Sequence, residues 1–185
     1  GGSDSFMVKL SPSGQHLWST YLGLVRSSSI AVDSSGNMLV TALFFYRTSG
    51  DPGFASTTSV VKLSPSGQHL WSTEFGEAEV NAGSVHDIAV DGSGNVLVTG
   101  TTSSSGWTSG GFDTSYNGGV SDAFVLKLSP SGQRLWSTYL GGSDVDSGFG
   151  VAVDGSGNVL VSGTTFSSGW IGGGFDGRDA RGSGV

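Results

Sequence analysis

The stretch FVLKLSPSGQRLWSTYLG, residues 124–141, occurs in three versions in this chain of 185 residues. The other two are FMVKLSPSGQHLWSTYLG from Phe6 and SVVKLSPSGQHLWSTEFG from Ser59. A second phrase follows each copy: IAVDSSGNMLVTA from Ile30, IAVDGSGNVLVTG from Ile88 and VAVDGSGNVLVSG from Val151. Repeats of this length are typical of stacked structural units rather than of one irregular core.

The first phrase predicts a β-hairpin. In the copy at residues 124–128, Phe124, Leu126 and Leu128 alternate with other residues, which is the period of a strand. The following SPSG supplies turn chemistry, because proline presets φ and glycine accepts a positive φ. Residues 135–140 then return as a second strand.

The second phrase predicts another hairpin. Residues 151–153 and 159–161 are short apolar runs, and the DGSGN between them is a turn. Apolar residues on both faces indicate strands that are covered on both sides. No stretch shows a sustained helical period, so we predict an all-β protein.

Four strands per repeat favour the blades of a β-propeller. A β-sandwich also tolerates many short strands, but it does not require an identical hairpin in every unit. We predict one propeller segment, residues 1–185. Its repeats, each a pair of hairpins, cover about 3–42, 56–102 and 121–165.

One tryptophan recurs at the same place in every first phrase, as Trp18, Trp71 and Trp136. An aromatic side chain of this size hides about 150–250 Å² when it is buried. We interpret these residues as packing anchors, each docked on the next blade. The alternative, a row of tryptophans that stack on sugars, is the weaker interpretation.

Composition excludes several classes of function. The net charge of −7 offers no basic face for nucleic acid. No apolar run is long enough for a membrane helix. The absence of cysteine excludes disulfides, thiol catalysis and cysteine–zinc sites, and it leaves the redox compartment open. The composition, which is rich in Gly, Ser and Thr, favours an extracellular or cell-surface protein.

The turns at Asp91 and Asp154 superficially suggest calcium loops. Each offers one carboxylate, whereas a calcium loop needs six to eight oxygens. We therefore predict hairpin turns in which Asp bonds to its own backbone, and no metal site. The glycine-rich runs are not followed by a helix, so we predict no nucleotide cofactor.

We predict no catalytic residues. His86 and its neighbour Asp87 lack a nucleophile that would complete a catalytic set. Glu74, Glu77 and Glu79 could be paired acids for glycoside hydrolysis, but their surroundings favour a solvated surface. On these grounds the chain is expected not to be an enzyme.

Two long loops are the candidates for ligand contact. They read SSGWTSGGFD at residues 104–113 and SSGWIGGGFD ending at Asp176. An aromatic ring beside a carboxylate suits a sugar or a peptide. The candidate residues are Trp107, Phe112, Asp113, Trp170, Phe175 and Asp176. The alternative is that Trp107 and Trp170 fold back to cover an exposed blade face.

Three segments resemble the SBBP family of bacterial β-propeller repeats: DAFVLKLSPSG from Asp122, STYLGGSD from Ser137 and VAVDGSGNVLVSGTT from Val151. The linker FDTSYNGG from Phe112 is similar to the same family. GVAVDGSGNVLV from Gly150 also resembles NHL-type propeller repeats, which implies that the VAVD strand lies innermost.

If the VAVD strand is the innermost strand of each blade, complete blades cover about residues 27–76 and 85–141. Half-blades then cover residues 1–26 and 142–185. Joining the two half-blades would give three blades, fewer than the usual four to eight. We therefore expect a fragment of a larger propeller, or one that closes only by self-association.

The resemblance implies a non-enzymatic scaffold for protein or glycan recognition in a bacterial surface or secreted protein. An alternative is the propeller portion of an enzyme, quinoprotein-like or hydrolase-linked, whose active groups lie outside this chain. SPSGQRLWST from Ser129 slightly resembles quinoprotein-type repeats, which also build propellers.

Overall fold

A computed structural model describes residues 4–23, 25–47, 54–75 and 83–170. These residues contain twelve β-strands and no helix. The strands are β1 (Ser5–Leu10), β2 (His16–Gly23), β3 (Val25–Val32), β4 (Met38–Arg47), β5 (Phe54–Leu63), β6 (His69–Phe75), β7 (Ser84–Val90), β8 (Val96–Thr102), β9 (Asp122–Leu128), β10 (Arg134–Leu140), β11 (Asp146–Val153) and β12 (Val159–Thr165).

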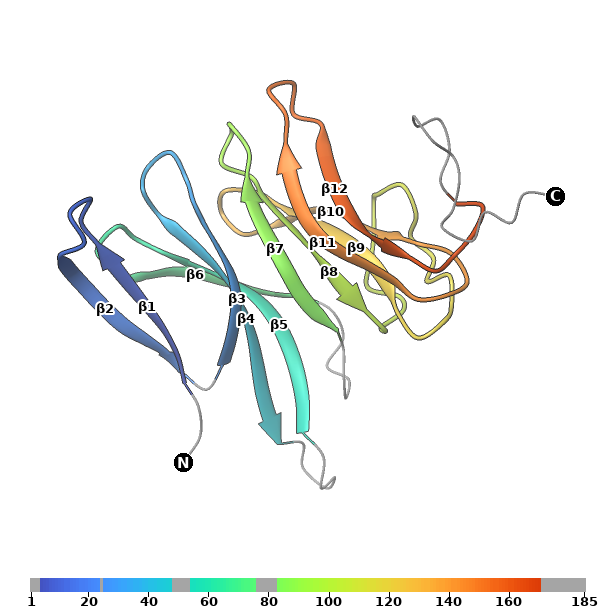
Figure 1. The fold of residues 1–185 in the computed structure, drawn as a ribbon, viewed down its shortest axis with the longest axis horizontal. Helices are drawn as coiled ribbons and strands as arrows, with labels where there is room; N and C mark the ends of the chain where they lie inside the picture. The colour runs from blue at the N-terminus through green and yellow to red at the C-terminus, as the bar shows by residue number, and fades with distance from the viewer. Residues whose placement is uncertain (1–3, 24, 48–53, 76–82, 171–185) are drawn as a thin grey trace.

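The strands form four antiparallel sheets that follow one another along the molecule (Figure 1). The two inner sheets have four strands each, β3 to β6 and β7 to β10, in chain order. The hairpins β1–β2 and β11–β12 are two-stranded sheets at opposite ends of the row. The predicted all-β, propeller-like fold is confirmed. No helix in the described residues could cross a membrane.

The first strands of successive sheets are neighbours, because β7 lies against β3 on one side and β11 on the other. The carboxylate of Asp87 on β7 links all three. Its Oδ1 accepts a hydrogen bond from Ser29 Oγ at 3.0 Å, and its Oδ2 accepts one from Val151 N at 2.9 Å. One side chain therefore fixes the spacing of three strands from three sheets.

The turns between the first and second strands have the predicted chemistry. Asp91 Oδ1 accepts hydrogen bonds from the backbone N–H groups of Ser93 and Asn95, both at 2.9 Å. Gly94 takes a φ of 80°, which favours glycine. The prediction that Asp bonds to its own backbone in these turns is confirmed.

A lysine from the third strand of each complete sheet reaches back to this turn. Lys62 Nζ lies 2.9 Å from Asp33 Oδ2, and Lys127 Nζ lies 2.9 Å from Asp91 Oδ2. Burial raises the pKa of Asp33, but hydrogen bonds from Asn37 and the contact with Lys62 outweigh it and lower the pKa to about 2. The ion pair therefore stays formed well below neutral pH.

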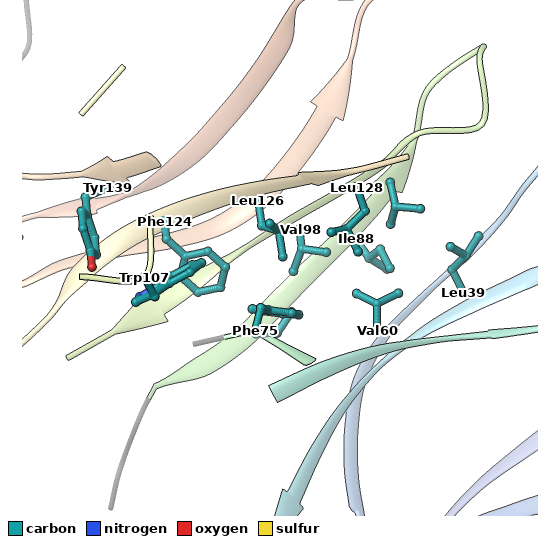
Figure 2. Close-up of a cluster of buried hydrophobic side chains, with 12 residues drawn as sticks. Leu39, Val60, Phe75, Ile88, Val98, Trp107, Phe124, Leu126, Leu128 and Tyr139 are labelled. Atoms are coloured by element: carbon teal, nitrogen blue, oxygen red, sulfur yellow. The ribbon is translucent and has the colours of Figure 1, made fainter. Parts of the chain in front are cut away.

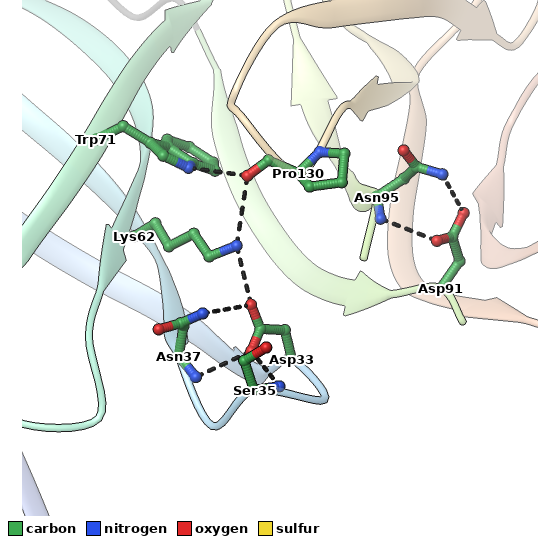
Figure 3. Close-up of polar contacts among 8 residues, drawn as sticks. All are labelled: Asp33, Ser35, Asn37, Lys62, Trp71, Asp91, Asn95 and Pro130. Atoms are coloured by element: carbon green, nitrogen blue, oxygen red, sulfur yellow. Dashed lines mark hydrogen bonds and ion pairs between the residues drawn. The ribbon is translucent and has the colours of Figure 1, made fainter. Parts of the chain in front are cut away.

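Adjacent sheets are joined by a contact that we call the proline clamp (Figure 3). Trp71 Nε1 donates to the carbonyl oxygen of Pro130 at 3.1 Å, and Lys62 Nζ donates to the same oxygen at 3.4 Å. Gly132, with a φ of 82°, faces the Trp71 ring so closely that a Cβ there would lie 2.9 Å from it. One sheet earlier, the clamp consists of Trp18, Lys9 and Pro65.

The larger hydrophobic core lies between the two four-stranded sheets (Figure 2). Leu39 and Val60 come from β4 and β5, and they face side chains of the next sheet such as Ile88 and Leu126. The buried members of this cluster are Leu39, Val60, Phe75, Val85, Ile88, Val96, Val98, Trp107, Phe124, Leu126, Leu128 and Tyr139. Strands covered on both faces explain the apolar runs in the sequence.

Candidate functional site

The loop between β8 and β9, residues 103–121, is bound along the outer edge of β10. Ser137 N donates to Ser109 O, and Tyr139 N donates to Asp113 O, both at 2.8 Å. Gly110 forms an isolated parallel bridge with Ser137. The loop therefore covers a strand edge that would otherwise be open, and its position is fixed by backbone hydrogen bonds.

This loop places Trp107 in the hydrophobic core, where 7% of its surface is exposed. Its ring lies edge-on to Phe124 at 5.2 Å and to Tyr139 at 6.0 Å between centroids, and Phe75 lies at 6.2 Å (Figure 2). The Arg134 guanidinium lies 5.7 Å from the ring centroid. These contacts account for the side chain as part of the packing between sheets.

Phe112 and Asp113 of the same loop line a pocket of about 410 Å³ together with Trp170. The rest of the wall consists of Asn117, residues 139–143 and residues 168–169. Three of the residues predicted to contact ligand are thus brought together from two loops. Phe175 and Asp176 lie outside the described residues.

The pocket combines apolar rings with polar groups. Phe112 is 87% exposed, so its ring is available for contact. Asp113 Oδ1 accepts from Ser115 N at 2.9 Å, and Oδ2 accepts from Asn117 Nδ2 at 2.7 Å. Each carboxylate oxygen has two acceptor positions, so capacity remains for a ligand hydroxyl or amide.

Trp170 is held on the opposite side by Thr165. Its Nε1 donates to Thr165 Oγ1 at 3.0 Å, and the side chain is half-buried. Trp170 and Trp107 occupy the same place in their loop phrases, yet only Trp107 is enclosed by third and fourth strands of its own sheet. The sequence alone could not separate these two environments.

Two buried aspartates that sequence reasoning missed support the pocket wall. Asp122 Oδ2 accepts from Asn117 N at 2.8 Å. Asp146 Oδ2 accepts from Gly142 N at 2.9 Å and from Ser167 Oγ at 2.8 Å. A signal was present in the sequence, since Asp122 and Asp4 occupy equivalent positions in their repeats, each two residues before the phenylalanine of the first phrase.

The electrostatic environment of Asp122 favours its neutral form. Burial raises the pKa of the carboxyl to about 6, and the carboxylates of Asp146 and Asp113 act in the same direction. The hydrogen bond from Asn117 N lowers the pKa but does not outweigh these effects. Because this pKa exceeds the ordinary value of 3.8, the native state binds more protons than the unfolded state between the two values.

We therefore expect the protein to become more stable as the pH falls from 7 to 5, by about 1 kcal/mol from Asp122. Asp122→Asn should lack this increase, because amides do not titrate. Urea denaturation of both proteins at pH 7, 6 and 5 measures the effect. An equal increase in the two proteins would contradict the assignment to Asp122.

The residues that were weighed as catalytic groups lie outside this pocket or outside the described residues. His86 Nε2 lies 2.8 Å from Ser84 Oγ, and His86 Nδ1 lies 2.7 Å from Gly148 O. The Asp87 carboxylate is directed to Ser29 and Val151 instead, as described above. Glu74 is exposed on β6, and Glu77 and Glu79 lie outside the described residues. Among the residues that the structure describes, no group of three or more His, Cys, Asp or Glu could hold a metal ion.

Comparison with protein families gives two matches. Residues 70–107 and residues 135–168 each match the family model of the SBBP beta-propeller repeat. Two segments of the chain thus match the SBBP repeat. The first repeat runs from within β6 through β8 to Trp107, and the second from within β10 through β12 to Ser168. Each matched segment takes its strands from two adjacent sheets and ends in the loop phrase that contains Trp107 or Trp170. A search of curated proteins gave no match.

Proposed function

We propose that this SBBP-repeat chain is a non-enzymatic propeller scaffold that recognises protein or glycan ligands through its loops. The proposal includes an extracellular or cell-surface location in a bacterium. The observation that carries it is the pocket in which Phe112, Asp113 and Trp170 meet. Its volume of about 410 Å³ lies within the range of about 300–1,000 Å³ that small-molecule sites occupy.

A short glycan fits this pocket best. Aromatic side chains offer flat apolar surfaces for the C–H faces of a sugar ring, and Phe112 and Trp170 lie in different walls. Asp113 and Asn117 supply acceptor oxygens for hydroxyls beside those rings, since Asn117 Nδ2 already donates to Asp113 Oδ2 and Gly141 O. Residues 141–143 of the pocket wall follow directly after β10, whose hydrogen-bonded end positions them, and this limits the ordering cost of binding.

The non-enzymatic character is supported by how the polar groups of the pocket are used. Asp113 stabilises the loop through Ser115 and Asn117, while Asp122 and Asp146 lie buried in its support. Ser143, a hydroxyl in the pocket wall, has no histidine beside it in the described lining. This set of groups can bind and orient a ligand, and it supplies no activated nucleophile.

The proposal is tested by screening the chain against an array of mono- to tetrasaccharides and a peptide library. Titration calorimetry then gives Kd for the best glycan. Phe112→Ala is expected to weaken binding about two- to tenfold, because an aromatic contact of this kind is worth about 0.5–1.5 kcal/mol. Asn117→Ala should weaken it as well.

Phe149→Ala is the matched control, since Phe149 is an exposed aromatic on β11 outside the pocket. Its Kd should equal that of the unchanged chain. Binding of a peptide but no glycan would show that the ligand is a protein. Binding that Phe112→Ala leaves intact would exclude this pocket.

A further inference from the structure

The two terminal hairpins lack contacts that the complete sheets make. Lys62 and Lys127 each pair with an aspartate in the first turn of their own sheet. The equivalent lysine on β1 is Lys9, and the equivalent aspartate after β11 is Asp154. They are at opposite ends of the molecule, and the described part of the chain gives neither an ion-pair partner.

Two further contacts are present in the complete sheets and absent from the terminal hairpins. Gly36 and Gly94 in the first turns face Pro65 and Pro130 of their own sheets, whereas their equivalent Gly157 faces nothing within 4 Å. Gly67 and Gly132 are covered by Trp18 and Trp71 of the preceding sheet. Their equivalent Gly14 is likewise uncovered.

The proline clamp is also incomplete at one end. Trp18 and Trp71 each donate to a proline carbonyl of the following sheet. Within the described residues, Trp136 has no such acceptor. Each contact that the C-terminal side lacks therefore has a matching residue on the β1–β2 hairpin. These residues are Lys9, Pro12 and Gly14.

The apolar surfaces follow the same division. Phe6 and Tyr21 of the N-terminal hairpin are 67% and 79% exposed, while their equivalents Phe124 and Tyr139 are 3% and 0% exposed. On the C-terminal hairpin, Leu160 is 52% exposed and its equivalent Leu97 is fully buried. In the complete sheet, Trp107 from the loop after the second strand covers Phe124 and Tyr139, and Leu97 lies between the first and third strands. Each terminal hairpin lacks the half-sheet that supplies these neighbours.

We propose that the β1–β2 hairpin of a second copy of this chain pairs with β12 and completes the sheet β11-β12-β1-β2. The register follows from the equivalent pair, in which Val98 lies opposite Leu126. It places Val161 opposite Val8 of the second copy. The same docking brings Asp154 to Lys9, Gly157 to Pro12, and Trp136 to the Pro12 carbonyl and Gly14.

Two copies satisfy both ends at once. Each copy has two complete sheets, and each of the two contacts adds one completed sheet. The closed assembly is a six-bladed ring, within the usual range of four to eight blades. A head-to-tail contact that closes in this way leaves no open strand edge at either joint.

This inference shares one residue with the proposed ligand pocket, because Trp170 also lines that pocket. Trp170 is equivalent in sequence to Trp107, which packs against Phe124 and Tyr139, so Phe6 and Tyr21 of the second copy would cover part of its ring. Phe112 and Asn117 belong to the other wall. Variants of those two residues report on ligand binding without altering the contact between copies.

Cysteine crosslinking tests the register directly, since the natural chain contains no cysteine. A variant with Val8→Cys and Val161→Cys places the two thiols opposite each other, with Cα atoms about 4.5–5.5 Å apart, which a disulfide spans. The control, Leu10→Cys with Val161→Cys, places them diagonally at about 7–8 Å. After mild oxidation, the first variant should give at least about tenfold more covalent dimer on a non-reducing gel than the control.

Light scattering on the unchanged chain is the second measurement, and it does not depend on the cysteine variants folding. The expected mass is twice that of one chain, and Lys9→Glu should weaken the dimer at least about tenfold by placing like charges together. A monomer at all concentrations would overturn the proposal. Equal crosslinking in both cysteine variants would overturn the register, and larger assemblies would overturn the ring.

Discussion

Replacing Trp107 with alanine is expected to lower the free energy of unfolding by about 3–5 kcal/mol, the usual cost of truncating a large buried aromatic. The ring is enclosed by Phe75, Phe124 and Tyr139, which belong to two different sheets. Its removal leaves a cavity between these sheets, and it removes the surface over which Arg134 lies. The largest part of the effect is therefore loss of packing.

Urea denaturation followed by circular dichroism measures this change. Phe112→Ala is the matched control, because Phe112 belongs to the same loop but is 87% exposed. Its free energy of unfolding should lie within about 0.5 kcal/mol of the unchanged chain. Equal stability losses in the two variants would show that the loop, rather than the buried ring, determines stability.

The second large effect is expected for Trp71→Ala, at about 2–3 kcal/mol. The change removes a hydrogen bond to Pro130 O, worth about 1 kcal/mol, and the contact of the ring with Gly132. It also removes the ring whose centroid lies 5.9 Å from Lys62 Nζ. The loss falls on the joint between the two four-stranded sheets, so those sheets should unfold less cooperatively.

Thermal unfolding followed by both far-ultraviolet and near-ultraviolet circular dichroism tests this expectation. The two curves should coincide for the unchanged chain and separate for Trp71→Ala. Leu70→Ala is the control, since Leu70 precedes Trp71 on β6 and is 49% exposed. A Trp71→Ala variant with the melting temperature of the control would refute the clamp as a stabilising contact.

Most of the fold could be predicted from the sequence because the information is local and repeated. Alternation in residues 124–128 predicted a strand, and the Asp91 turn formed with the predicted hydrogen bonds. The ion pair between Lys127 and Asp91 was not predicted. The two residues are distant in sequence, and their contact depends on how β9 pairs with β8.

The candidate site was less predictable, because the same short sequence occurs in two different structural environments. Trp107 and Trp170 have the same immediate neighbours in sequence, SSGW, and the first lies in the core while the second lines the pocket. Whether such a tryptophan is buried in the core or lines the pocket depends on strands that come later in the chain. The role of Asn117 was missed because it is set by a hydrogen bond to Asp113 within the folded loop.

The matched SBBP repeats begin in the last strand of one sheet and end after the second strand of the next. The repeating unit of the sequence is thus offset from the four-stranded sheet. Inserting one further copy of the sequence unit would lengthen the row by a whole sheet and leave the two terminal hairpins as they are. The residues that the proposed pairing of β12 with β1 needs would therefore be kept when the number of sheets changes.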